Sequence, residues 1–316
     1  MTAELRSIAP WRLRTRTLEL GARTLVMGVV NITPDSFSDG GFFLTSDEGV
    51  AHALRLIDEG ADLLDLGAES TRPGSRAGVA DAAVHPSDKD LSPGTPAVSA
   101  EEEQARLLPV LKGILKARPD AVISVDTYKA ATARAALEAG AEIINDVSGF
   151  TWDASLAQVC AEFGAGVVLT HTRGRPEEWR TQAQLEPEAL MATVRDGLMV
   201  SVDAARGAGI AEDRIVLDPG YGFGKKFDEN YALLARQGEL LALAKPLLAG
   251  LSRKSFLGHT LAGLYGGNPA PVEARETASI AALTAAILSG ASIVRVHEVK
   301  AAVEAARIAD AVLRAG

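Results

Sequence analysis

The sequence has a single cysteine among 316 residues, so the chain lacks a partner for an intramolecular disulfide. One unpaired cysteine indicates a reducing compartment, where disulfides are rare. Cys160 lies in the segment LAQVCAEF, whose apolar residues have helical spacing. Because no histidine or asparagine partner is evident nearby in the sequence, we predict a buried helix residue rather than a reactive thiol.

The sequence also lacks long apolar runs and an excess of positive charge. No run approaches the ~18 residues of a membrane span, and the N-terminal segment contains no apolar core of signal-peptide length. The formal net charge of −9 disfavours general binding to nucleic acid or to an anionic membrane, which needs clustered Lys and Arg. We therefore expect a cytoplasmic protein without nucleic-acid or membrane partners. A small anionic substrate remains compatible, because it needs only a few local cations.

From Leu25 onward the sequence repeats one pattern, in which a short apolar run ends in polar residues and glycine and a segment of helical periodicity follows. Continuous apolar strands separated by helices imply parallel strands covered on their outer face. Eight such units predict an α/β fold, a (β/α)8 TIM barrel, in one domain spanning residues 1–316. A doubly wound open sheet fits less well, because no Gly-rich phosphate loop follows the first run. The eight runs lie at residues 25–30, 62–67, 121–126, 142–147, 166–171, 215–220, 246–252 and 292–297.

Two segments depart from this pattern. Residues 13–25, LRTRTLELGARTL, alternate around Gly21 and predict an N-terminal β-hairpin that caps one end of the barrel. Residues 75–96 are rich in Pro, Gly, Ser and Asp and have no period, which is typical of a long mobile insertion loop.

Polar residues within the apolar runs are the first candidates for a site, because the loops after the strands build the active site of such a barrel. Asp126, Asn145 and Asp218 stand at the ends of three runs. A buried carboxylate is costly unless it is paired or hydrogen-bonded, so these residues either satisfy loop amides and nearby cations or bind a ligand. A fixed carboxylate suits a flat ligand that presents two adjacent N–H groups, since both oxygens can accept.

Cations at other strand ends form a second group, made of Arg72, Lys254, Arg295 and His297. Lys254 and Ser255 also begin a predicted helix, whose free N–H groups favour anions. Phosphate commonly binds near the last two strands of these barrels. Pairing with the interior carboxylates is the alternative role for these cations. At the end of the first run, Asn31 offers an oxygen ligand for Mg2+, which takes few protein ligands together with substrate phosphates.

Other catalytic signatures are missing. The five histidines lie far apart and there is no paired cysteine, so no zinc site is predicted. Neither a GxSxG motif nor a Walker loop occurs. The GYGFG run at residues 220–224 lacks GxGxxG spacing, so we interpret it as a loop that lets backbone approach a ring.

Six segments, in order, resemble dihydropteroate synthases. They are MGVVNITPDSFSDGG, GADLLDLGAESTRPG, ISVDTYKAATARAALEAGAEIINDVSG, DPGYGFGKKFDENYALL, GLSRKSFLG and GASIVRVHEVK, and they extend from Met27 almost to the end of the chain. The resemblance implies a (β/α)8 barrel, usually a homodimer and a sulfonamide target. It also implies an enzyme that joins 6-hydroxymethyl-7,8-dihydropterin diphosphate to 4-aminobenzoate with Mg2+, giving 7,8-dihydropteroate and pyrophosphate.

The resemblance also implies roles for individual residues. Those that bind the pterin map onto Asp126, Asn145, Asp218, Phe223 and Lys254. Those that hold the diphosphate map onto Asn31 (through Mg2+), Thr71, Arg72, Arg295 and His297. The 4-aminobenzoate ring is expected among Phe37, Pro73, Lys254 and Ser255. Asp39, on the first loop with Asp35, is expected to stabilise a cation at the pterin methylene.

The sequence departs from the family pattern at three places. Where the family usually reads LMHMRG, this chain reads LTHTRG, with Thr170 and Thr172, so one wall of the pterin pocket becomes smaller and more polar. Glu298 replaces the usual aspartate after His297, and residues 75–96 interrupt the usual run from TRPG into a helix. Two alternatives stay open: a non-catalytic pterin-binding paralogue, and a methyltransferase that binds methyltetrahydrofolate in a related barrel.

Overall fold

The computed structural model describes residues 6–32, 46–69 and 98–315. Its centre is a closed barrel of eight parallel strands in the order β10-β3-β4-β5-β6-β7-β8-β9, which confirms the predicted (β/α)8 fold. The strands are β3 Leu25–Asn31, β4 Leu63–Gly67, β5 Ile123–Asp126, β6 Ile143–Asp146, β7 Gly166–Thr170, β8 Ile215–Asp218, β9 Leu247–Ala249 and β10 Ala291–Val296. Each lies within one of the eight apolar runs or extends it by a residue.

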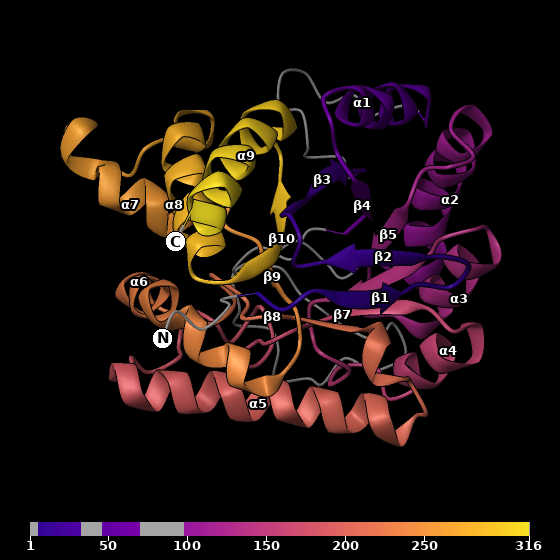
Figure 1. Ribbon diagram of the computed structural model, residues 1–316. Coiled ribbons are helices and arrows are strands. Elements are labelled where there is room, and N and C mark those ends of the chain that lie inside the picture. Colours follow the sequence, from indigo (N-terminus) through magenta and orange to yellow (C-terminus); the bar gives the residue numbers. More distant parts are fainter. Residues whose placement is uncertain (1–5, 33–45, 70–97, 316) are drawn as a thin grey trace, which may run out of the picture.

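Helices surround the barrel on its outside, and Figure 1 shows them arranged around the strands. The α-helices are α1 Ser46–Asp58, α2 Ala100–Ala117, α3 Ala130–Glu138, α4 Leu156–Phe163, α5 Pro187–Gly207, α6 Phe227–Arg236, α7 Ser255–Thr260, α8 Glu276–Leu288 and α9 Val299–Ala315. Short 3-10 helices are η2 Glu212–Arg214, η3 Gln237–Leu243, η4 Leu261–Leu264 and η5 Val272–Arg275. None of the helices in these described ranges combines the length and apolarity that a bilayer crossing needs.

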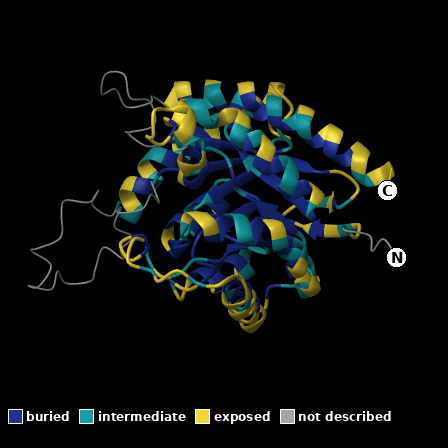
Figure 2. Ribbon diagram, turned by 90° about the vertical axis from the view of Figure 1, so that its left-hand side faces the viewer, coloured by how far each residue is buried: buried dark blue, intermediate teal, exposed yellow. Residues whose placement is uncertain are grey.

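Local sequence explains where individual helices begin and end. Ser99 accepts a hydrogen bond from the Glu102 amide, and the Glu102 side chain accepts one from the Ser99 amide, so a capping box starts α2. Gly164 ends α4 in the left-handed conformation (φ +60°), which a glycine adopts without strain. Cys160 lies in α4 and is fully buried, as predicted, and burial raises the pKa of its thiol. Figure 2 shows the resulting pattern, with buried strands inside and helices exposed on one face.

An antiparallel hairpin, β1 Ala9–Arg12 and β2 Thr17–Leu20, lies across the N-terminal end of the barrel. Trp11, Leu13 and Leu20 pack with apolar side chains contributed by all eight strands. Those side chains are Leu25, Met27, Leu63, Val122, Ile143, Val168, Val216, Leu248 and Ile293. The hairpin therefore plugs this end, as the sequence predicted.

The predicted position of the hairpin turn was wrong. The chain reverses at residues 13–16, where the Leu13 amide donates to the Arg16 carbonyl (2.8 Å). Gly21 instead follows β2 with φ +95° and leads the chain toward β3. Its Cα lies so close to the Ser7 carbonyl that an added Cβ would be 2.4 Å from that oxygen, so this position requires glycine for a second reason.

Candidate active site

The interior of the barrel changes from apolar to polar along most of the strands that carry a plug side chain; on β3 the change comes later, because Val29 follows Met27 and Asn31 is the first polar residue. Successive side chains of a strand alternate between its faces, so the residue two places after a plug residue also faces inward. Two places after the plug, toward the C-terminal ends, stand Asp65, Ser124, Asn145, Thr170, Asp218, Gly250 and Arg295. The next inward-facing positions, two residues further along the chain from Asp65, Ser124 and Arg295, are Gly67, Asp126 and His297. The sequence therefore places a polar layer directly above an apolar one.

Arg295 lies at the centre of this polar layer. Its Nε donates to Asp65 Oδ2 (2.5 Å) and its Nη2 donates to Asp126 Oδ2 (2.7 Å). Burial alone would lower the pKa of the Arg295 guanidinium, but Asp65 and Asp126 more than offset it and raise that pKa. The sequence left open that the cations pair with interior carboxylates. Arg295 does so.

Asp65 is the residue that sequence reasoning missed. It is fully buried and also accepts hydrogen bonds from Ser124 Oγ (2.6 Å) and from Asn145 Nδ2 (2.9 Å). It therefore fixes three neighbouring side chains at once. A carboxylate in the middle of the apolar run DLLDLG was the available signal, by the same reasoning that selected Asp126.

Asp126 and Asp218 face the interior with different partners. Burial raises the pKa of Asp126 to about 7; Arg295 opposes this shift and Asp65 adds to it. Burial also raises the pKa of Asp218, whose Oδ1 accepts a hydrogen bond from the Gly220 amide (2.7 Å). Gly250 faces Asp218 without a side chain, since an added Cβ would lie 3.7 Å from Asp218 Oδ2. Asp218 Oδ2 makes no hydrogen bond within the described residues, so this oxygen is left for a ligand.

Lys254 is the residue immediately before α7, as predicted, and Ser255 is the first residue of that helix. The helix is shorter than the predicted segment, because the chain continues as the 3-10 helix η4 after Thr260. The Lys254 amine lies 4.0 Å from the centre of the Phe223 ring. Burial lowers the pKa of Lys254 to about 8, and the charge of Asp218 opposes that shift.

His297 lies at the end of β10 and is held by the loop after β9. Its Nδ1 is 2.9 Å from Ser252 Oγ, and its amide donates to the same hydroxyl (3.2 Å). Arg253, next to Ser252, has a positive φ (+59°) and forms an ion pair with Glu298. The unusual Glu298 therefore ties the β9 loop to the end of β10, beside His297.

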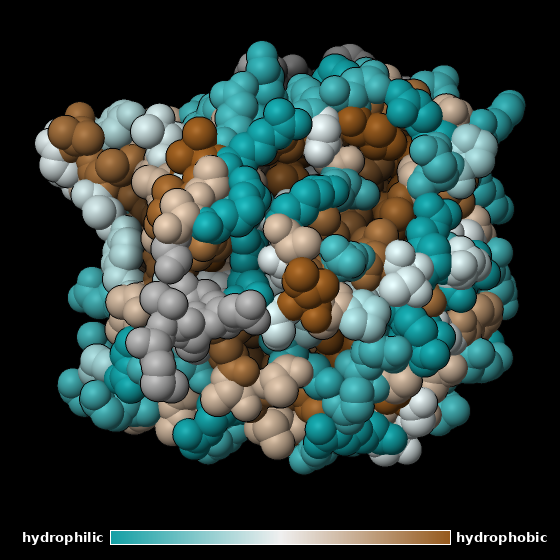
Figure 3. All heavy atoms as spheres, in the orientation of Figure 1, coloured by the Kyte–Doolittle hydropathy of each residue, from teal (hydrophilic) through white to brown (hydrophobic). Residues whose placement is uncertain are grey.

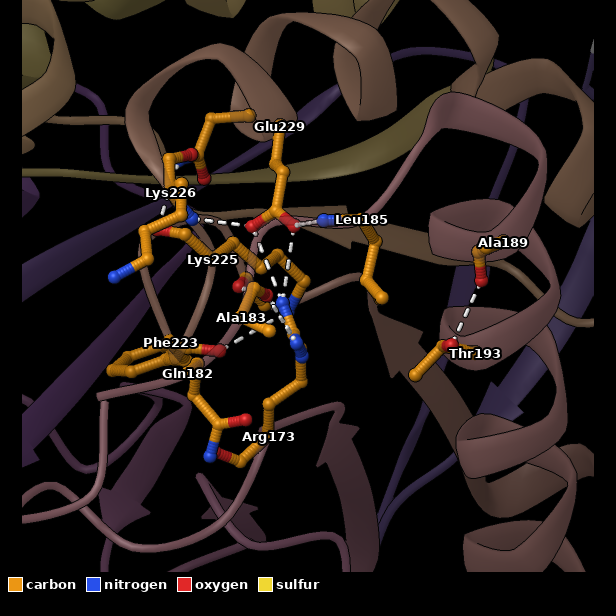
Figure 4. Close-up of polar contacts among 12 residues, drawn as sticks. Arg173, Gln182, Ala183, Leu185, Ala189, Thr193, Phe223, Lys225, Lys226 and Glu229 are labelled. Carbon is orange, nitrogen blue, oxygen red and sulfur yellow. Dashed lines mark hydrogen bonds and ion pairs between the residues drawn. The ribbon is translucent and has the colours of Figure 1, made fainter. Parts of the chain in front are cut away.

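The loops after β7 and β8 are joined by a buried ion pair, shown in Figure 4. Arg173 Nη1 lies 3.1 Å from Glu229 Oε1, and the two side chains are 9% and 1% exposed. Arg173 Nη2 also donates to the Ala183 carbonyl (2.8 Å), and Glu229 accepts a bond from the Leu185 amide (2.6 Å). The pair therefore fixes the long β7–α5 loop against the start of α6.

Phe223 takes its position from this loop junction. Its ring packs against Trp179 with a centroid separation of 5.1 Å, and its carbonyl accepts a hydrogen bond from the Arg173 amide (3.4 Å). Lys225 is buried and donates to the carbonyls of His171 (3.2 Å) and Gly220 (2.8 Å). The GYGFG segment is therefore a rigid wall, which agrees with the interpretation that its backbone approaches a ring.

Thr170 and Thr172 have different surroundings. Thr170 is buried at the inner face of β7, as the register partner of Asp218. The Thr172 hydroxyl lies in the following loop, where it donates to the Gly174 carbonyl (3.0 Å) and accepts from Trp179 Nε1 (3.1 Å). Between them, His171 faces α5, where its ring packs closely against Gly197.

Asn31 lies at the end of β3, opposite Gly67 of β4. Its side chain makes no hydrogen bond within the described ranges, so its amide oxygen is available to a hard cation. In those same ranges no three His, Cys, Asp or Glu residues come together in a group that could hold a metal ion. The donor set thus fits an ion that takes one protein oxygen and completes its shell from substrate and water.

Some predicted site residues fall on ranges outside the described residues. These are Asp35, Phe37, Asp39, Thr71, Arg72 and Pro73, together with the whole insertion at 75–96. The structure places all the others at the ends of β3, β5, β6, β8 and β10 or in the segments that follow β8 and β9: Asn31, Asp126, Asn145, Asp218, Phe223, Lys254, Ser255, Arg295 and His297.

Known proteins have similar sequences and the same fold. The profile of the family described as pterin binding enzyme matches residues 27–85 and 89–297. Dihydropteroate synthase of Mycobacterium leprae is 42% identical over 291 residues, which cover 92% of this chain and 94% of that protein. The structure of Yersinia pestis dihydropteroate synthase with a sulfonamide drug has a TM-score of 0.82 and 37% identity, covering 97% and 100% of the two chains. Xanthomonas albilineans dihydropteroate synthase with 7,8-dihydropteroate has a TM-score of 0.77 and 37% identity, covering 96% and 98%.

Proposed function

Because the chain belongs to the pterin-binding enzyme family and acts as a dihydropteroate synthase, we propose that its polar barrel interior binds the pterin and that the ends of β9 and β10 bind the diphosphate. The reaction condenses 6-hydroxymethyl-7,8-dihydropterin diphosphate with 4-aminobenzoate and releases pyrophosphate. The substrate therefore has a flat ring rich in N–H groups and a strongly anionic tail, and these two parts need different surroundings.

The charges of the polar layer suit the ring rather than the tail. Three carboxylates, Asp65, Asp126 and Asp218, face two cations, Arg295 and Lys254, so this layer has no net positive charge for an anion. Carboxylates accept hydrogen bonds from ring N–H groups, and Asp218 Oδ2 has no hydrogen-bond partner within the described residues. This balance of charge is the observation that carries the assignment.

Asn145 completes the set of ring contacts. Its Nδ2 donates to Asp65, so its amide oxygen is the atom left for a ligand. The proposed pterin contacts are thus two carboxylates and one amide oxygen, from β5, β6 and β8. Phe223 and Lys254 form the wall of the ring site on the side of the loops.

The diphosphate belongs at the outer end of the site. His297 lies there, and Arg295 reaches it from the interior with its Nη1, which makes no hydrogen bond within the described residues. We assign Thr71 and Arg72 to the same role. Asn31 would hold Mg2+, which supplies positive charge against the diphosphate when it is bound.

In the mechanism we propose, the C–O bond at the pterin methylene breaks first and pyrophosphate departs toward Arg295, His297 and Arg72. The resulting cation is delocalised into the ring, with Asp39 as its counter-charge. The neutral amino group of 4-aminobenzoate then attacks the methylene and loses a proton. Catalysis is mainly electrostatic and positional, because the residues hold charges where they develop.

The second substrate is assigned to the mouth of the site, among Phe37, Pro73, Lys254 and Ser255. Sulfonamide binding at the same place is part of the proposal, supported by the drug complex of the Yersinia pestis relative. We also propose that the enzyme is a single domain and is cytoplasmic, and its single, buried cysteine is consistent with a reducing compartment.

A homodimer is also proposed, on the surface between α7 and α8. Four apolar side chains are exposed there, and Figure 3 shows a hydrophobic corner where Figure 1 places α7. They are Leu264, Tyr265, Val272 and Leu288. Burial of such a patch against a second copy would remove it from water. Sedimentation equilibrium of the protein and of Leu264→Glu tests this assembly.

The assay that tests the assignment measures pyrophosphate release from purified protein given the pterin diphosphate, with and without 4-aminobenzoate and with Mg2+ or EDTA. Release that requires Mg2+ and yields dihydropteroate supports the division of roles. Pterin diphosphate that binds without any turnover would contradict it, and activity that persists in EDTA would remove Mg2+ from the proposal.

A further inference from the structure

Thr170 differs from the other residues of the polar layer. The others are charged residues, an amide, a glycine or a hydrogen-bonded serine, whereas the Thr170 side chain is neutral and makes no hydrogen bond within the described residues. It lies two residues after Val168, which belongs to the apolar plug, so both side chains face the barrel axis. Its methyl group packs near Gly220, where an added Cβ would lie 3.1 Å from Thr170 Cγ2. The residue is only 3% exposed.

The hydroxyl of Thr170 makes no hydrogen bond with any part of the chain that the structure describes. Its neighbours in the layer differ: Ser124 and Asn145 donate to Asp65, and Asp218 accepts from the Gly220 amide. The Thr170 hydroxyl is not among the fully buried side-chain atoms that lack a partner, so it reaches the open interior of the site rather than being sealed off from water. A ligand bound in the site can therefore meet this hydroxyl directly.

The strands on either side determine which ligand group could be that partner. β7 lies between β6 and β8. Thr170 is the register partner of Asp218 on β8, on strands that lie about 4.8 Å apart, whereas Asn145 on β6 pairs with Val168, the preceding inward position of β7. A ring whose N–H groups bond both the Asn145 oxygen and the Asp218 carboxylate therefore passes across β7, and its atoms next to the Asp218 contact meet Thr170. In a pterin, that part of the ring is the 2-amino end.

We propose that Thr170 is a specificity-determining residue of this enzyme, whose hydroxyl accepts a hydrogen bond from the 2-amino group of the pterin. The inference rests on the proposed function, because it assumes the pterin lies against Asn145 and Asp218. A hydroxyl can accept and donate, so Thr170 adds a polar contact where an apolar side chain would supply only packing. The alternative is that Thr170 fills space and discriminates by shape alone.

The experiment compares Thr170→Val, which keeps the shape and removes the hydroxyl, with Thr170→Ser, which keeps the hydroxyl. Thr193→Val is the matched control, because the Thr193 hydroxyl donates only to the Ala189 carbonyl of its own helix, away from the site (Figure 4). KM for the pterin diphosphate, KM for 4-aminobenzoate and kcat are measured with the natural substrate and with its 2-desamino analogue.

We expect Thr170→Val to raise KM for the natural pterin diphosphate about three- to tenfold, the usual worth of one hydrogen bond. KM for 4-aminobenzoate should stay unchanged in Thr170→Val. Thr170→Ser and Thr193→Val should have the KM values of the wild type for both substrates. With the 2-desamino analogue, wild type and Thr170→Val should have equal KM values, since the partner of the hydroxyl is gone.

A Thr170→Val effect of the same size on both substrates would overturn the contact and leave shape as the role of Thr170. An unchanged KM in Thr170→Val would overturn it as well. Failure of the proposed function has a different signature: Asp218→Asn would then leave pterin diphosphate binding intact, whereas a wrong Thr170 contact leaves Asp218→Asn impaired.

Discussion

The two ends of the barrel interior are built from the same strands but differ in chemistry. At the N-terminal end every strand supplies an apolar side chain, and Trp11, Leu13 and Leu20 of the hairpin close the space. Two residues further along the same strands, the interior holds Asp65, Arg295 and other polar groups. A step of two residues along a strand therefore separates a layer that stabilises the fold from a layer that we propose binds the substrate. The apolar layer stabilises the fold, and this stabilisation offsets the free-energy cost of the polar layer, because buried charges cost free energy even when they are paired.

The largest expected effect is on activity at the polar end. Arg295→Ala should lower kcat/KM at least a hundredfold, since it removes charge from the departing pyrophosphate. It should also destabilise the protein by about 3–5 kcal/mol, because it leaves Asp65 buried without its partner. Steady-state kinetics and urea denaturation measure the two effects. The double variant Arg295→Met/Asp65→Asn should recover much of the stability and none of the activity; recovered activity would contradict the role of Arg295.

At the apolar end the effects should be reversed. Trp11→Ala should reduce the free energy of unfolding by about 3–5 kcal/mol, because Trp11 is 1% exposed in the plug. The kcat/KM of the fraction that remains folded should be unchanged. Ile8→Ala is the control, since Ile8 is 67% exposed beside the same hairpin. A large loss of kcat/KM in folded Trp11→Ala would show that the two layers are not separable.

The loop junction should lie between these extremes. Arg173→Met breaks the buried pair with Glu229 and loosens the wall that carries Phe223. We expect KM for the pterin diphosphate to rise about tenfold, with a smaller change in kcat, because the junction positions the ring without touching the departing group. Arg134→Met removes an exposed ion pair with Glu162 and should change neither constant. If kcat fell and KM stayed constant, the junction would act on chemistry rather than on binding.

The smallest effect should be a pH dependence that comes from the polar end alone. The Asp126 carboxyl has a pKa of about 7 and loses its ability to accept N–H groups as pH falls below that value. The Lys254 amine has a pKa of about 8 and loses its charge as pH rises above that value. The kcat/KM should therefore be maximal between the two and fall by about half at each. Lys254→Arg should abolish the alkaline decline, and a decline that persists in this variant would assign it to another group.

The sequence predicted the barrel well because each strand is a continuous apolar run and each helix has its own period. The turn of the hairpin was misplaced because Gly21 is a strong turn signal, although here it serves a close approach to Ser7. Of the site, the strand-end residues Asp126, Asn145, Asp218 and Arg295 were predicted from their polarity. Their mutual pairing was not, because register and reach between strands determine which carboxylate meets which cation.

Two elements of the site were not predicted. Asp65 is a carboxylate inside an apolar run, which was a signal, but its role depends on inward neighbours from β5, β6 and β10. Arg173 and Glu229 are 56 residues apart, and no spacing rule connects them. Such contacts follow from the folded geometry, whereas the sequence supplies only the residue types.

The hairpin plug also constrains the order of events when the chain is made on a ribosome. Trp11 and Leu20 are synthesised before much of the surface that they cover, which includes Val216, Leu248 and Ile293. The hairpin lacks a complete docking surface until β10 has joined β3 and the barrel has closed. The hairpin is therefore made before the barrel but docks after it, and a nascent chain halted before Ile293 would leave Trp11 and Leu20 exposed.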